Sequence, residues 1–155
     1  PSVFKKMTVE DNIWSILETR KDLSKKEKKD MLEQLIEDFS ITKIRRQKAY
    51  TLSGGERRRT EIARSLAIQP KFLMLDEPFA GIDPIAVADI KNLIKILCNR
   101  GIGILITDHN VRDTLEITDR AIIINNGQII TQGTKADILK SEEARTIYLG
   151  NDFEM

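Results

Sequence analysis

Two acidic side chains, Asp76 and Glu77, directly follow the short apolar run 72–75 (FLML). Such a run predicts a fully buried strand of a parallel sheet, and carboxylates that follow it lie at the sheet edge where open α/β sheets bind ligands. Asp76 suits Mg²⁺, a hard cation that binds carboxylate, water and phosphate oxygens, and Glu77 could orient or deprotonate a water. Phosphoryl transfer needs this pair of roles. The alternative is a strand that ends in solvated carboxylates.

A second motif lies upstream, in residues 52–56 (LSGGE). Ser53-x-x-Glu56 is a capping box and predicts a helix start, where bare N–H groups can bind an anion. Gly54 and Gly55 allow another group to approach the backbone closely. An ordinary capped helix is the alternative, but two glycines in a first turn weaken a helix, which favours a functional reason for them.

These motifs, in this order, resemble those of ABC-type ATPases. Residues 52–56 resemble the signature motif and residues 72–77 resemble the Walker B strand. Residues 80–83 (AGID) stand where the family has its D-loop, and His109, after the apolar run 104–106, stands where it has its switch histidine. The resemblance covers essentially the whole chain and implies an α/β fold of the P-loop NTPase (ABC ATPase) type.

The resemblance also implies roles for individual residues. Glu77 would polarise the attacking water, His109 would contact the γ-phosphate of ATP, and Asp76 would hold Mg²⁺. Nucleotide contacts across a dimer of two copies are implied for five residues, Ser53, Gly54, Gly55, Glu56 and Asp83. For Asp83 the sequence also predicts a helix N-cap, because Pro84 follows it. Of Arg57, Arg58 and Arg59, at least one is expected to face the nucleotide or a neighbouring glutamate.

The sequence contains no Gly-x-x-x-x-Gly-Lys-Ser/Thr phosphate loop, which the family carries upstream of the region seen here. We therefore interpret the chain as the C-terminal part of a longer nucleotide-binding domain and expect an incomplete fold. Residues 1–68 are expected to form the helical subdomain, and residues 69–155 part of the parallel core sheet with a C-terminal tail. The chain as given is expected to be inactive alone.

Motif details resemble the branch of the family that powers lipopolysaccharide export. They are LSGGERRR at 52–59, DEPFAGIDPI at 76–85, TDHNVR at 107–112 and Tyr148-Leu149-Gly150 near the end. ATPases of branched-chain amino acid importers are the first alternative. A soluble ABC ATPase of nucleic-acid repair or translation, and a truncated non-catalytic interaction module, are further hypotheses.

Composition restricts the choice of partners and compartment. The net charge of the 155 residues is +1, so no nucleic-acid partner is expected. The single cysteine, Cys98, fits a reducing compartment and is expected to pack in a helix. No apolar run approaches membrane-spanning length. The resemblance implies a cytoplasmic protein, peripheral on the inner membrane, with transmembrane permease subunits and a second copy as partners; Phe4, exposed before the first helix, is the candidate contact.

Local sequence signals for helix starts and turns predict the helices and strands that position these residues. Further capping boxes at Thr8, Ser24 and Thr134 predict helices, and Asn126-Gly127 predicts a hairpin turn between two strands. Ser40 to Thr51 is expected to be a polar linker. The remaining expectations are a helix from Asp83 to Arg100 ending at Gly101, a buried strand over 102–107, a short helix over 110–115, strands over 120–124 and 128–131, and a last helix from Ser141 to Gly150.

Overall fold

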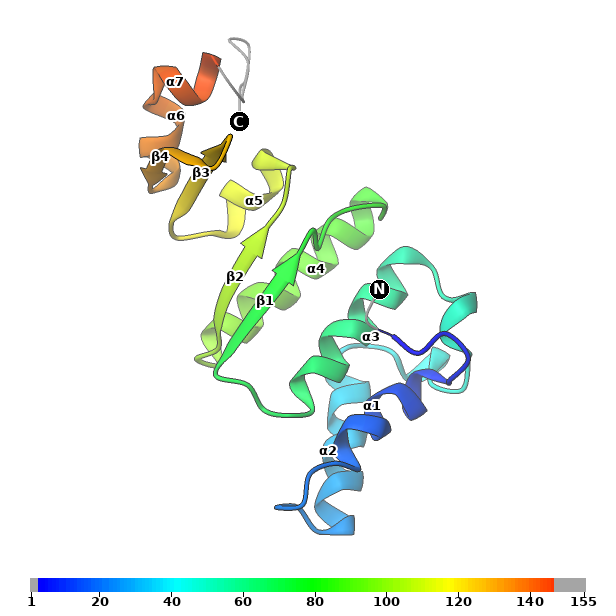
Figure 1. The fold of residues 1–155 in the computed structure, drawn as a ribbon. Coiled ribbons are helices and arrows are strands. Elements are labelled where there is room, and N and C mark those ends of the chain that lie inside the picture. Colours follow the sequence, from blue (N-terminus) through cyan, green and yellow to red (C-terminus); the bar gives the residue numbers. More distant parts are fainter. Residues whose placement is uncertain (1–2, 147–155) are drawn as a thin grey trace. The chain divides into compact units, whose positions relative to one another are not determined.

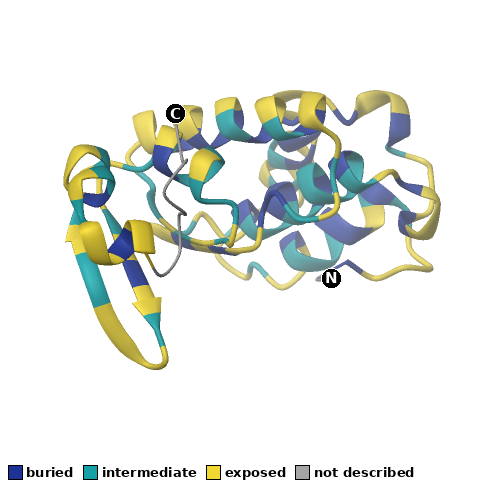
Figure 2. Ribbon diagram, turned by 90° about the horizontal axis from the view of Figure 1, so that it is seen from above, coloured by how far each residue is buried: buried dark blue, intermediate teal, exposed yellow. Residues whose placement is uncertain are grey.

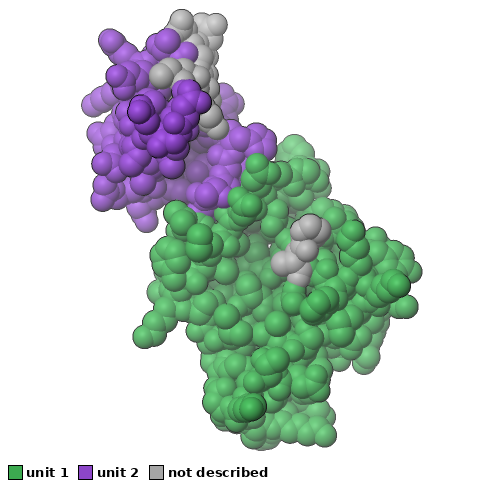
Figure 3. Space-filling model, viewed as in Figure 1, with its two compact units in different colours: residues 1–105 green, residues 106–155 purple. Residues whose placement is uncertain are grey.

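The computed structural model describes residues 3–146, and the chain forms two compact units, residues 1–105 and residues 106–155 (Figure 3). The predicted boundary between residues 68 and 69 lies within the first unit. The expected chain end at Tyr148-Leu149-Gly150 lies outside the described residues. No helix among residues 3–146 is long and apolar enough to cross a membrane.

The first unit begins with three helices, α1 (Val9–Leu17), α2 (Lys25–Asp38) and α3 (Gly54–Leu66) (Figure 1). Each starts with the predicted capping box, in which the N-cap hydroxyl and the third helical carboxylate each accept a backbone N–H. Their apolar faces pack on one another and form a core. Its fully buried side chains include Val9, Ile13, Leu17, Ile36, Phe39, Ile41 and Ile62.

The predicted linker over residues 40–51 is more ordered than expected. It contains two 3₁₀ turns, η1 (Thr42–Ile44) and η2 (Ala49–Thr51). Ile41, Ile44 and Ala49 are buried, so this segment is part of the helical core. Three isolated apolar residues among polar ones carry no helical or strand period, which is why the sequence alone did not indicate them.

A strand–helix–strand unit follows, made of β1 (Phe72–Asp76), α4 (Pro84–Asn99) and β2 (Gly103–Thr107). β1 and β2 are hydrogen-bonded neighbours, and their arrows point the same way in Figure 1. As predicted, Asp83 caps α4, Pro84 is its first residue, and Gly101 follows the helix end with a φ of +84°. The expected α/β fold with a parallel sheet is confirmed.

The expectation that both strands are fully buried is wrong. Burial alternates along β1: Leu73 and Leu75 are buried, whereas Phe72 is 58% exposed and Met74 70% exposed. In β2, Leu105 is exposed. A strand is buried throughout only where both sheet faces are covered, and among the described residues one face of β1 packs while the other is open. Cys98 of α4, expected to pack, is also exposed.

The second unit contains α5 (Val111–Ile117), β3 (Ala121–Asn125), β4 (Gln128–Gly133), α6 (Lys135–Lys140) and α7 (Glu142–Ala144). β3 and β4 form the predicted antiparallel hairpin, with Asn126 and Gly127 both at positive φ in the turn. Its small core comprises Leu115, Ile123, Ile138 and Ala144. Figure 2 shows how buried positions recur along one side of the helices while the other side is exposed.

Candidate functional site

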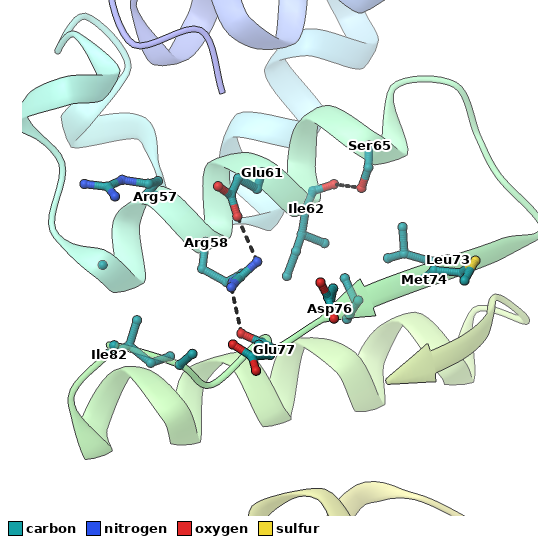
Figure 4. A pocket seen from close by; sticks show the side chains of 14 residues that line it. Arg57, Arg58, Glu61, Ile62, Ser65, Leu73, Met74, Asp76, Glu77 and Ile82 are labelled. Atoms are coloured by element: carbon teal, nitrogen blue, oxygen red, sulfur yellow. Dashed lines mark hydrogen bonds and ion pairs between the residues drawn. The ribbon is translucent and has the colours of Figure 1, made fainter. Parts of the chain in front are cut away.

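A cleft of about 710 Å³ lies in the first unit between α3 and the end of β1 (Figure 4). α3 contributes Gly54, the arginines Arg57 and Arg58, and Glu61. The strand end contributes Asp76 and Glu77, and the following loop closes the cleft with Ala80, Gly81 and Ile82. The signature and Walker B motifs, which are about 20 residues apart in sequence, therefore line one cavity.

Asp76 is the last residue of β1 and is exposed to solvent. No group of three or more potential metal ligands occurs among residues 3–146. Mg²⁺ does not need such a group, because it usually keeps several waters and binds one or two carboxylates together with substrate phosphates. A single exposed carboxylate in a cleft wide enough for phosphates fits that pattern.

Glu77 has a backbone φ of +44°, in the left-handed region that residues other than glycine rarely adopt. Two donors hold its carbonyl oxygen: the backbone N–H of Ala80 at 3.2 Å and Nη2 of Arg58 at 2.8 Å. Strained residues of this kind persist only where neighbours over-determine them, and they concentrate at functional sites. The chain thus bends sharply at the residue predicted to act on water.

Ser53 and Glu56 form the start of α3. Oγ of Ser53 accepts the Glu56 N–H at 3.3 Å, and Oε2 of Glu56 accepts the Ser53 N–H at 2.9 Å. The Glu56 carboxylate is therefore engaged in capping the start of α3. The Ser53 hydroxyl accepts one bond there and retains its own hydrogen for donation.

Gly54 and Gly55 pack against the loop after β1 and the first turn of α4. A Cβ atom on Gly54 would lie 2.8 Å from Cγ2 of Ile82 and 2.9 Å from the carbonyl oxygen of Gly81. A Cβ on Gly55 would lie 2.7 Å from the Cβ of Ala86. The sequence predicts a close approach at these glycines. In this structure the D-loop segment of the same chain approaches Gly54, and the first turn of α4 approaches Gly55.

The loop that meets the signature segment ends at Asp83. Its Oδ1 accepts the N–H of Ala86 at 2.9 Å, so the predicted helix cap is present. The N-cap bond occupies only part of the Asp83 carboxylate, which leaves room for a second contact. A role of Asp83 at a dimer interface stays a prediction.

The three consecutive arginines of α3 have different partners. Arg58 pairs with Glu61 at 2.9 Å, as expected for an arginine facing a glutamate. Arg59 pairs with Asp89 of α4 at 3.1 Å. Nη2 of Arg57 lies 3.4 Å from the carbonyl oxygen of Leu52. The bond from Arg58 to the Glu77 backbone has no signal in the sequence, because it depends on how α3 crosses the strand end.

His109 lies in the second unit, in the turn between β2 and α5. Its imidazole is 69% exposed, and Nδ1 lies 3.8 Å from Oδ1 of Asp108. The same Oδ1 accepts the N–H of Asn110 at 2.8 Å. The predicted position after a strand is confirmed. Its predicted contact with the γ-phosphate of ATP stays a prediction.

Phe4 is 49% exposed just before α1, and its ring lies under the guanidinium of Arg64, 4.5 Å from Cζ to the ring centroid. The side chain of Asn12, which is fully buried, fixes its backbone. Oδ1 of Asn12 accepts the Phe4 N–H at 2.7 Å, and Nδ2 donates to the Phe4 carbonyl at 3.1 Å. The result is an aromatic ring presented in a fixed place on the surface.

Comparison with known proteins identifies a family and similar relatives. A family model described as ABC transporter matches residues 1–80. The chain is 51% identical over 154 residues to the lipopolysaccharide export system ATP-binding protein LptB of Haemophilus influenzae, and 49% identical over the same length to LptB of Escherichia coli. These matches cover 99% of the chain and 64% of each relative, so the chain spans about two thirds of their length.

Solved structures give the same result. An ATP-binding cassette of an ABC transporter in its ADP conformation matches with a TM-score of 0.78 and 30% identity, covering 95% of this chain and 64% of that one. The cbiO1 protein of Clostridium perfringens, part of the transporter complex cbiONQ, matches with a TM-score of 0.81 and 26% identity, covering 94% and 57%. The expected fold class is therefore confirmed by these neighbours.

Proposed function

Because the chain belongs to the ABC transporter family of ATP-binding proteins, we propose that it is the C-terminal part of a subunit that binds and hydrolyses ATP to drive transport. The observation that carries this proposal is that the carboxylates of Asp76 and Glu77 lie together in one cleft at the end of β1. Phosphoryl transfer depends on positioning and on charge stabilisation, and this cleft brings together groups suited to both.

In the proposed reaction, the oxygen of a water forms a bond to the γ-phosphorus of ATP while the bond to the bridging oxygen of ADP breaks. Glu77 orients this water and accepts its proton, and its fixed backbone limits where the carboxylate can point. Asp76 holds Mg²⁺, which when bound offsets phosphate charge. His109 contacts the γ-phosphate from the turn after β2.

A second copy completes each nucleotide site in this proposal. The start of α3, with Ser53, Gly54, Gly55 and Glu56, faces the phosphates bound by the other copy. Free N–H groups at a helix N-terminus favour an anion, and the hydrogen of the Ser53 hydroxyl remains to be donated to a phosphate oxygen. Asp83, on the loop packed against Gly54, lies at the same dimer interface.

The transported substrate we propose is lipopolysaccharide, and the support is the 49–51% identity with LptB, the ATP-binding protein of the lipopolysaccharide export system. The subunit would then lie on the cytoplasmic face of the inner membrane, bound to transmembrane permease subunits. Phe4 is the proposed contact with the permease, because an exposed aromatic ring on a fixed backbone is a typical anchor for a partner.

The test is Glu77→Gln in the complete protein. ATP affinity should be retained, and phosphate release should fall by about 10²- to 10⁴-fold, the usual contribution of a general base. Sedimentation velocity should show an ATP-dependent dimer of this variant, with monomers in ADP. Asp89→Asn, which removes an exposed carboxylate of α4 paired with Arg59, is the matched control and should hydrolyse ATP normally.

The outcomes separate the parts of the proposal. Undiminished phosphate release by Glu77→Gln would remove the role given to Glu77. Absence of ATP binding by the unaltered complete protein would overturn the whole assignment. A variant that binds ATP but stays monomeric would contradict the shared nucleotide site.

A further inference from the structure

Arg58 connects the signature helix to the backbone of the proposed catalytic residue. Its Nη1 lies 2.9 Å from Oε2 of Glu61, and its Nη2 donates to the carbonyl oxygen of Glu77 at 2.8 Å (Figure 4). The side chains of Arg58 and Glu61 are 22% and 10% exposed, so their ion pair is partly shielded from water, where charge-assisted hydrogen bonds are strong. The bond from Arg58 to the Glu77 carbonyl lies on the exposed side of the cleft.

The acceptor is the strained residue of the cleft. Glu77 has a φ of +44°, and a residue other than glycine persists there only when its surroundings hold it. The guanidinium is planar and rigid, and Glu61, one turn further along the same helix, fixes its orientation. The Glu77 carbonyl is therefore held in a fixed position relative to α3 by the Arg58–Glu61 pair.

We propose that Arg58 is a positioning residue for ATP hydrolysis: it holds the left-handed turn at Glu77, and so aims the Glu77 carboxylate at the attacking water. This inference rests on the proposed function. It has a consequence for regulation, because α3 begins at Ser53, where the nucleotide of the other copy is proposed to bind. A displacement of α3 on nucleotide binding would pass through Arg58 to Glu77 of the same chain, and so would couple the two sites of the dimer.

The experiment uses the complete protein with Arg58→Gln and Arg58→Lys. For Arg58→Gln, kcat should fall by about 10- to 100-fold, as expected when a reacting group is displaced slightly, while KM for ATP changes little. Arg58→Lys should recover part of the loss, because one ammonium can reach the Glu77 carbonyl but cannot form both bonds of the fork. Arg100→Gln, which removes a surface ion pair with Asp38 elsewhere in the unit, is the matched control.

A double variant identifies the residue through which Arg58 acts. In the Glu77→Gln background, adding Arg58→Gln should lower the residual rate no further, because residues that act as one unit are not additive. Rate losses that multiply would overturn the inference. So would a raised KM with unchanged kcat, which would indicate direct nucleotide binding, or a melting temperature lowered well below that of Arg100→Gln, which would indicate a purely structural role.

Failure of the proposed function would look different. It would appear in the unaltered protein as absent ATP hydrolysis, or in Glu77→Gln as full activity, before any Arg58 variant is compared. Full activity of Arg58→Gln beside an inactive Glu77→Gln would overturn this inference alone.

Discussion

At the scale of single residues, two physical effects on stability oppose each other at Gly55. In the first turn of α3, alanine is favoured over glycine by about 0.5–1 kcal/mol through backbone entropy. A Cβ at this position, however, would lie 2.7 Å from the Cβ of Ala86. Overpacking of this kind typically costs about 1–3 kcal/mol. The packing effect is the larger, so glycine is needed here because α3 and α4 meet closely.

We therefore predict that Gly55→Ala lowers the free energy of unfolding of the complete protein by about 1 kcal/mol, the difference between the mid-range values of these two effects. Ala86→Gly creates room for the new methyl group, so the double variant should be more stable than the sum of the two single changes predicts. Denaturant titration of all four proteins measures this coupling. Strict additivity would show that the two positions do not touch in solution.

At the scale of elements, the turn between α1 and α2 is tied to the end of α3 by Arg20. Its guanidinium donates to the Ala67 carbonyl at 3.0 Å and to Oε1 of Gln69 at 3.0 Å, and pairs with Asp22 at 2.6 Å. The hydrogen bond from Arg20 lowers the pKa of Asp22 to about 2. Asp22 thus orients the side chain that anchors the segment leading into β1.

The sign of the pH effect follows from the lowered pKa. An aspartate titrates near pH 3.9 in the unfolded chain, so its stabilising contribution is present above that pH and is lost as the pH falls toward 2. Asp22→Asn should melt at a lower temperature than the unaltered protein at pH 5, and this difference should shrink toward zero near pH 2. Thermal unfolding across this range is the measurement, with Asp30→Asn as the control carboxylate. A difference independent of pH would contradict the pair.

Elements also differ in how far the sequence specifies them. The starts of α1, α2, α3 and α6 are predicted correctly because each is encoded within four residues by a capping box. The burial of β1 is predicted wrongly because it depends on which elements cover the sheet, not on the strand. The same reason explains the site: Asp76 and Glu77 follow from a local pattern, whereas the bond from Arg58 to Glu77 arises only from the crossing of two elements.

At the scale of the whole molecule, the proposed contact with the permease depends on the exposed ring of Phe4. This ring is held by buried Asn12 and stacked on Arg64. Both supports belong to the helical part of the first unit, so the ring has a defined place without a partner. A preordered aromatic loses little side-chain entropy on binding.

We predict that Phe4→Ala in the complete protein weakens association with the permease subunits by about 2 kcal/mol or more, the range of an aromatic anchor. Co-purification and titration with the membrane complex measure this effect, and an unchanged melting temperature verifies the fold. Ile68→Ala, which truncates another exposed apolar side chain near the end of α3, should associate normally. Equal losses in both variants would argue against a specific contact at Phe4.

The capping boxes also lead us to expect a particular order of folding. Each closes a turn between residues three apart, a contact that forms rapidly because it requires almost no loop closure. The pairing of β1 with β2 must instead join segments separated by the whole of α4, and such distant contacts form late. Newly synthesised chain can therefore acquire helices with fixed starting points before the strand that carries Asp76 finds its neighbour. The bend at Glu77, which needs both α3 and that strand in place, then belongs among the last steps of folding.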